Sequence, residues 1–214
     1  MYGLLLRSIQ AYLRATFGAV VWARVLRLSG QPVDGFEPML PYDAQVLDSV
    51  LAAAAAELNR PVEAILEDVG TFLVANPDHQ SLRRLLRFGG ATFAEFLQSL
   101  EELPDRARLA LPDLELPQIT LHETGPGFFR LTFGSSFAAF YPVALGALRA
   151  TADDYGALVL IDTEPSCNEG LSGAVLSVNL LEPEHGLGQR FELSLMGRAN
   201  EGSGQDVGRD RDGL

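Results

Sequence analysis

The 214-residue sequence contains a single cysteine, Cys167, and this scarcity excludes two kinds of site. One thiol cannot form an intrachain disulfide, and it cannot supply a multi-thiolate metal centre. Cys167 follows Pro165 and Ser166 and has no basic neighbour that would favour the reactive thiolate. We therefore expect an inert exposed thiol in a reducing compartment.

Long hydrophobic runs are also missing. A membrane-spanning helix needs about 20 consecutive apolar residues, and the longest run here, from Val50 to Ala56, is short and rich in alanine. At the amino terminus Arg7 and Arg14 interrupt apolar residues that recur at helical spacing, which is not the pattern of a signal peptide. We therefore expect a cytoplasmic protein without a membrane partner.

Basic residues are scarce relative to acidic ones. The chain has 16 lysines and arginines against 28 aspartates and glutamates, for a formal net charge of -12. Because nucleic-acid binding depends on basic side chains that displace counterions from phosphates, this balance argues against a nucleic-acid partner. The same excess of acids disfavours anionic membrane surfaces.

Catalytic motifs are missing as well. The sequence has no glycine-rich phosphate loop, no Gly-x-Ser-x-Gly and no His/Glu pair at metal-binding spacing. Adjacent acids on a helix point about 100° apart, so Glu101 with Glu102, and Asp153 with Asp154, cannot flank one substrate bond. We expect both pairs to be solvated, and we expect no enzyme activity.

The residues that are present predict helices over roughly the first 110 positions, because apolar side chains recur at intervals of three and four. The first helix is expected from residue 3 to about 28, with a break at Gly18. Asp43 is expected to cap a second helix that ends at Leu58, and Pro61 to start a third. A short helix ends at Gly89 and Gly90. Thr92 and Glu95 then form a predicted capping box for a helix that continues to Leu103.

Beyond Pro112 the apolar residues alternate, which is typical of strands. We expect a hairpin of residues 114–122 and 128–133, then a helix over 137–153 capped by Ser135 or Ser136, then strands at 157–162 and 174–181. Residues 191–196, within the segment 184–197, are a candidate additional strand, and residues 198–214 are expected to be disordered. The order predicts an α+β fold, in which a helical amino-terminal part precedes a helix on a four- to five-stranded antiparallel sheet.

Three strings of residues carry a family resemblance. The first consists of Met1-Tyr2-Gly3 together with Phe17-Gly18 and Trp22. The second is Met39-Leu40-Pro41-Tyr42-Asp43. The third extends from Leu85 to Leu111-Pro112. In their order and spacing they resemble the haem nitric oxide/oxygen-binding (H-NOX) domain over residues 1 to about 183. The resemblance implies a distal helical part, about 1–76, and a proximal part with the sheet, 77–183.

The resemblance also implies where haem would be held. In the family, a histidine on the helix before the first hairpin ligates the iron, and a Tyr-x-Ser-x-Arg motif binds the propionates. The matching positions here are Pro104 and the string Phe133-Gly134-Ser135-Ser136-Phe137. Proline offers no lone pair to a metal, and Phe137 cannot pair with a carboxylate as arginine does. We therefore expect a degenerate member with no usual haem binding, and a helix that breaks or restarts at Pro104.

The ligand pocket of the family maps onto mostly apolar residues that any core would also require, so a filled core and a ligand cavity look alike in sequence. The residues that the resemblance places in the pocket are Leu5, Ile9, Val74, Leu100, Pro104, Pro112, Phe133, Ser135, Phe137, Tyr141 and Leu145.

Arginines form the main basic cluster of the sequence. This cluster could bind an acidic partner, or it could serve only for solubility and ion pairing. The candidate partner surface consists of Arg83, Arg84 and Arg87, with Arg106 and Arg108 nearby in sequence. The three histidines, His79, His122 and His185, are expected to be ordinary surface residues rather than metal ligands.

The leading hypothesis is a non-enzymatic sensory or regulatory H-NOX-like protein without a cofactor, which docks on a signalling partner. The resemblance implies a histidine kinase or a diguanylate cyclase as that partner. Two alternatives stay open: a haem-based NO or O2 sensor with atypical iron ligation, and a carrier or sensor of another apolar ligand.

Overall fold

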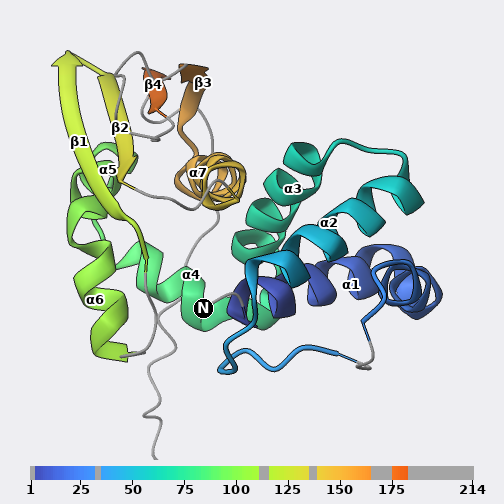
Figure 1. The fold of residues 1–214 in the computed structure, drawn as a ribbon. Coiled ribbons are helices and arrows are strands. Elements are labelled where there is room, and N and C mark those ends of the chain that lie inside the picture. The colour runs from blue at the N-terminus through green and yellow to red at the C-terminus, as the bar shows by residue number, and fades with distance from the viewer. Residues whose placement is uncertain (1–2, 32–34, 111–115, 135–138, 165–174, 183–214) are drawn as a thin grey trace, which may run out of the picture.

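A computed structural model describes residues 3–31, 35–110, 116–134, 139–164 and 175–182 of the chain. Figure 1 shows a group of amino-terminal helices beside a second group in which a sheet packs on a long helix. The architecture is α+β, as the sequence predicts. No helix among these residues combines the length and the apolar character needed to cross a bilayer.

Three helices build the amino-terminal part: α1 (Gly3–Leu28), α2 (Ala44–Leu58) and α3 (Val62–Ala75). The predicted break in α1 is confirmed, because Gly18 has φ 87° and ψ 166°, a conformation that only glycine adopts easily. Asp43 holds the predicted N-cap position of α2, although its side chain makes no capping hydrogen bond. Apolar faces of the three helices form one core, which includes Leu6, Ile9, Leu13, Val50, Ile65 and Val69.

Short helices connect this part to the sheet. They are η1 (Pro77–His79), α4 (Gln80–Arg87), α5 (Phe93–Ser99), η2 (Leu100–Glu102) and α6 (Leu103–Ala110). The capping box is confirmed: Thr92 Oγ1 accepts from Glu95 N at 3.2 Å, and the Glu95 carboxylate accepts from Thr92 N at 3.3 Å. The helix predicted to continue to Leu103 is interrupted just before Pro104: α5 ends at Ser99, the 3-10 turn η2 spans Leu100–Glu102, and α6 starts at Leu103.

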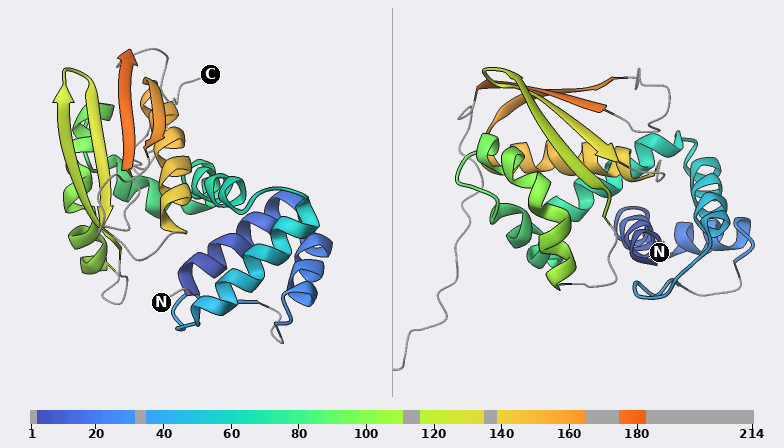
Figure 2. Two further views of the ribbon diagram at one scale, coloured as in Figure 1. Left: turned by 45° about the horizontal axis from the view of Figure 1, so that its top comes forward. Right: turned by 60° about the vertical axis from the view of Figure 1, so that its left-hand side comes forward.

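The sheet is four-stranded and antiparallel, with the order β1-β2-β4-β3. Its strands are β1 (Gln118–Gly125), β2 (Phe128–Gly134), β3 (Leu158–Glu164) and β4 (Val175–Glu182), and α7 (Phe140–Tyr155) lies between β2 and β3 in the chain. Figure 2 shows α7 beneath one face of this sheet. A second core fills the space between that face, α7 and α5, and it includes Phe93, Leu97, Leu131, Leu148, Ile161 and Leu176.

Three predicted boundaries in the sheet part are wrong. β1 starts at Gln118 rather than Leu114, because Gln118 already pairs with Gly134 at the end of β2 and residues 116 and 117 are not in a strand. It also continues to Gly125, which pairs with Phe128, so the turn shrinks to two residues with Gly127 at φ 77°. α7 starts at Phe140 rather than Phe137, since Ala139 lies in a turn. The proposed caps Ser135 and Ser136, and the candidate strand 191–196, lie outside the described residues.

α3 and α7 join the two parts of the molecule at a crossing where both helices carry glycine. A Cβ atom on Gly70 would overlap the carbonyl oxygen of Val143, and one on Gly146 would overlap the carbonyl oxygen of Glu67. Beside the crossing, Arg149 forms an ion pair with Glu67, and Thr71 Oγ1 donates to Gly146 O at 3.3 Å. The two glycines therefore set how closely the helical part approaches the sheet part.

Candidate functional site

The residues expected in a pocket are divided between the two cores. Val74, Leu100, Phe133 and Leu145 belong to the core between α7 and the sheet, and Tyr141 packs against it. Leu5 and Ile9 belong to the core of the amino-terminal helices. The remaining positions Pro112, Ser135 and Phe137 lie outside the described residues. The structure therefore places the described members on both sides of the junction between the two parts.

Pro104 is buried in the first turn of α6. Leu103, the preceding residue, donates its N–H to Leu100 O, so α6 continues directly from the 3-10 turn η2. Pro104 has no N–H to donate at this point, and its fixed φ suits the helix. The guanidinium of Arg106 holds this end of α6 against α5, because its Nη2 donates to Ser99 O at 2.8 Å. The side chain at position 104 is thus a rigid apolar ring without a donor atom.

Phe133, which is 4% exposed, lies on the covered face of β2. Its ring is 5.7 Å from the ring of Phe140 at the start of α7, with an interplanar angle of 60°. The ring of Phe133 is therefore packed in an apolar cluster, and it presents no hydroxyl there.

Tyr141 is the described member of the expected pocket that carries a titratable group. Burial raises the pKa of its phenol, while a hydrogen bond with Thr163 and the charge of Arg149 act in the opposite direction. Thr163 belongs to β3, so the hydroxyl is directed to the sheet side of α7. The phenol is neutral at physiological pH.

The arginines expected on a partner surface differ in their surroundings. Arg83 on α4 forms a salt bridge with Asp154 on α7, and the two side chains are 19% and 8% exposed. Arg84 is exposed, and the side chain of Arg87 is outside the described residues. Arg108 pairs with Asp105 at 2.6 Å. Arg83 therefore has a structural role, because it joins α4 to α7 through this salt bridge.

The prediction that both acidic pairs are solvated is wrong for Asp154, which is 6% exposed. Asp154 is buried because α7 presents it to Arg83, a contact that the local sequence does not encode. Asp153, Glu101 and Glu102 are exposed as expected. Glu101 also accepts a hydrogen bond from Leu121 N at 2.9 Å, which covers part of the outer edge of β1.

Metal ligands do not gather within the described part of the chain, where no group of three or more His, Cys, Asp or Glu side chains could hold an ion. His122 is exposed on β1, as expected. The side chain of His79, and residues Cys167 and His185, fall outside the described set, so the predictions for them stay predictions.

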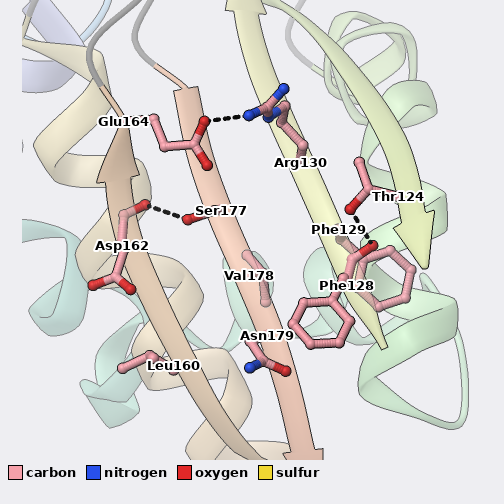
Figure 3. Close-up of a pocket in the computed structure, with 10 residues that line it drawn as sticks. All are labelled: Thr124, Phe128, Phe129, Arg130, Leu160, Asp162, Glu164, Ser177, Val178 and Asn179. Carbon is pink, nitrogen blue, oxygen red and sulfur yellow. Dashed lines mark hydrogen bonds and ion pairs between the residues drawn. The ribbon is translucent and has the colours of Figure 1, made fainter. Parts of the chain in front are cut away.

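A depression on the uncovered face of the sheet was missed by sequence reasoning. It has a volume of about 360 Å³ and is lined by Thr124, Phe128, Phe129, Arg130, Leu160, Asp162, Glu164, Ser177, Val178 and Asn179. Figure 3 shows Arg130 of β2 paired with Glu164 of β3 across β4 at one end. The only sequence signal was the alternation in β2 and β3, which does not tell which face is covered.

Comparisons with known proteins bear on this fold. The family described as haem-NO-binding matches residues 2–162. Soluble guanylate cyclase gcy-31 of Caenorhabditis elegans is 26% identical over 150 residues, which are 70% of this chain and 21% of that protein. Soluble guanylate cyclase 89Da of Drosophila melanogaster is 20% identical over 179 residues, or 82% of this chain and 27% of that protein. The chain thus spans about a quarter or less of the length of these relatives.

Solved structures show the same architecture. The Fe(II) unliganded H-NOX protein of K. algicida superposes with a TM-score of 0.70 at 18% identity, and the match covers 90% of this chain and all of the other. The Fe(II)NO state of an H-NOX protein from S. oneidensis gives a TM-score of 0.67 at 18% identity, covering 84% and 99%. Since the family match extends over most of the sequence and the fold agrees, this chain belongs to the haem-NO-binding (H-NOX) family.

Proposed function

We propose that this chain is a non-enzymatic regulatory member of the H-NOX family that does not hold haem in the family's usual way and acts by docking on a signalling enzyme. The observation that carries the proposal is the buried Pro104 in the first turn of α6. Iron ligation requires a lone pair, and the proline ring has none to offer. The donor set at this position therefore does not fit haem.

The packing around Phe133 supports the same conclusion. Val74, Leu100, Phe133 and Leu145 are between 1% and 6% exposed. These four side chains are in contact with other core side chains, as expected of residues that do not border an open cavity. The burial of these four positions supports a core that is packed without a ligand there.

The chemistry of the chain favours docking over catalysis. The sequence has no catalytic motif, and the described residues bring no metal-ligand cluster together. H-NOX domains signal to partner enzymes, and the resemblance places histidine kinases and diguanylate cyclases among them. We therefore propose an enzyme of that kind as the partner, with the signal passing through a surface of this chain.

An absorption spectrum tests the haem proposal. The full chain, expressed with a haem precursor and then titrated with haem in vitro, is expected to show no Soret band that shifts on addition of NO. A Soret band that shifts with NO would establish the alternative, a haem sensor with atypical ligation, and would overturn the proposal. A colourless protein that binds an apolar dye in competition with fatty acids would favour the carrier alternative.

The α4 arginines cannot all be tested in the same way. Charge reversal at Arg83 would break its salt bridge with the buried Asp154 and destabilise the fold. Weaker partner binding by that variant would therefore not show that Arg83 contacts the partner. Of the two α4 arginines whose side chains the structure describes, Arg84 is the exposed one. If this surface contacts the partner, Arg84→Glu weakens binding of a candidate kinase or cyclase at temperatures well below the melting temperature of the variant, and unchanged binding removes the surface from the proposal.

A further inference from the structure

The uncovered face of the sheet carries apolar side chains in register with one another. Phe128 of β2 and Leu160 of β3 both lie opposite Asn179 of the central strand β4. They are 49% and 52% exposed, and in Figure 3 they flank Asn179 from the two sides. Leu158 and Leu181 extend the exposed apolar surface. Contiguous apolar residues with a polar rim are typical of protein interaction sites.

Charged residues form one end of the same depression. Its lining contains one arginine and two acids, Arg130, Asp162 and Glu164, so it carries one net negative charge. Arg130 is paired with Glu164. Asp162 is exposed, and no ion pair between described residues includes it. The negative charge of the depression therefore resides on Asp162, next to the apolar row.

The geometry points to one kind of occupant. We propose that this depression docks a basic, apolar segment of the partner protein, which seats a large apolar side chain between Phe128 and Leu160 and pairs a lysine or arginine with Asp162. A volume of about 360 Å³ is large enough for one such apolar side chain. In protein interfaces, a few buried side chains of this type contribute most of the binding energy. The inference rests on the proposed function, in which the signal passes by docking.

A second copy of this chain fits the surface less well. A symmetric dimer brings the same patch of both subunits together. The two patches would each contribute a net negative charge, and each chain carries a formal net charge of -12. Because like charges repel across an interface, a basic partner is favoured over self-association.

Two synthetic peptides with a fluorescent label test the proposal on the full chain. One is Lys-Leu-Lys-Phe-Lys-Leu-Lys, and the other replaces each lysine with glutamate. Measured by fluorescence anisotropy at physiological salt, the basic peptide is expected to bind and the acidic peptide is not. Asp162→Lys is expected to weaken binding of the basic peptide at least tenfold, and Leu160→Ser at least fivefold, without a change in melting temperature.

Glu123→Lys is the matched control, because it makes the same change of charge at an exposed position on β1 outside the lining. It should change binding less than twofold. If Asp162→Lys and Glu123→Lys weaken binding of the basic peptide equally, the peptide is attracted only by the overall charge of the chain, and the proposal is overturned. So would equal binding of the acidic peptide, or a dimer in sedimentation that Leu160→Ser dissociates.

A synthetic peptide of residues 188–198 that displaces the basic peptide would assign the surface to the chain's own carboxyl-terminal segment and would also overturn the proposal. Haem uptake is read from absorption, independently of these titrations. A haem-loaded chain would contradict the proposed function, whereas a failed peptide titration would contradict only this docking surface.

Discussion

The guanidinium of Arg83 on α4 donates two hydrogen bonds to the carboxylate of Asp154 on α7, from Nε to Oδ2 at 2.6 Å and from Nη2 to Oδ1 at 2.5 Å. Bidentate arginine–carboxylate pairs are among the stronger polar contacts in proteins. This pair joins a short connecting helix to the helix that carries the sheet, and both side chains are largely removed from water. The loss of either partner leaves a charge that the site cannot solvate.

Asp154→Asn should therefore lower the free energy of unfolding by about 3 kcal/mol, the cost typical of breaking a buried ion pair on one side. Chemical denaturation at neutral pH measures the change. The neighbouring Asp153→Asn is the control, because Asp153 is exposed and surface substitutions usually change stability by less than about 0.5 kcal/mol. Similar values for the two variants would show that the pair does not stabilise the fold.

The close approach of α3 and α7 predicts that larger residues at the crossing lower the stability of the protein. Gly70→Ala or Gly146→Ala should destabilise the protein by about 1–3 kcal/mol, the usual range for overpacking, because the new methyl group meets a backbone carbonyl that cannot rotate away. Gly125→Ala, whose Cβ would lie 3.8 Å from Phe128, should be nearly neutral. Thermal unfolding of the three variants compares them, and an equal effect of all three would contradict a tight crossing.

Pro104→His tests whether the absent donor decides haem binding. The backbone should tolerate the substitution, because histidine has a free N–H and can adopt the helical angles of α6. If the missing donor is decisive, this variant takes up at least ten times more haem per chain than the parent when expressed with a haem precursor, as measured by Soret absorbance. Pro104→Ala controls for the loss of the ring. Equal absence of haem in both variants would place the defect elsewhere in the site.

The ionisation of Tyr12 on α1 should make the free energy of unfolding decrease at alkaline pH. Burial raises the pKa of Tyr12 from 10.0 to about 12, and its hydrogen bond to Asp68 Oδ2, 2.8 Å long, adds to the effect, while Arg60 opposes it. The folded chain thus keeps a proton that the unfolded chain loses first. The stabilising contribution of Tyr12 is present below pH 10 and is lost as the pH rises to about 12.

Chemical denaturation at a series of alkaline pH values measures this loss. Tyr12→Phe should flatten the decline in the free energy of unfolding between pH 10 and about 12, and Asp68→Asn should shift the decline to lower pH because it removes the neighbouring carboxylate. An unchanged decline in Tyr12→Phe would assign it to other groups.

The residue types at the expected haem site could be read from the sequence, because they depend only on which residue occupies a position. Proline at 104 and phenylalanine at 133 stand where the resemblance expects histidine and tyrosine, and no folding is needed to see that. The sequence could not show that Phe133 packs on Phe140, or that Asp154 is buried against Arg83. Those contacts depend on how α4, α7 and β2 approach one another.

The sequence by itself determined the order of the elements, the break at Gly18 and the capping box of Thr92 and Glu95, because these features depend on backbone preferences and contacts within about four residues. The strand order, the glycine crossing of Gly70 and Gly146 and the exposed depression between Phe128 and Leu160 were decided by tertiary structure. Alternation marks two faces of a strand, but only the packing of α7 selects which face is removed from water.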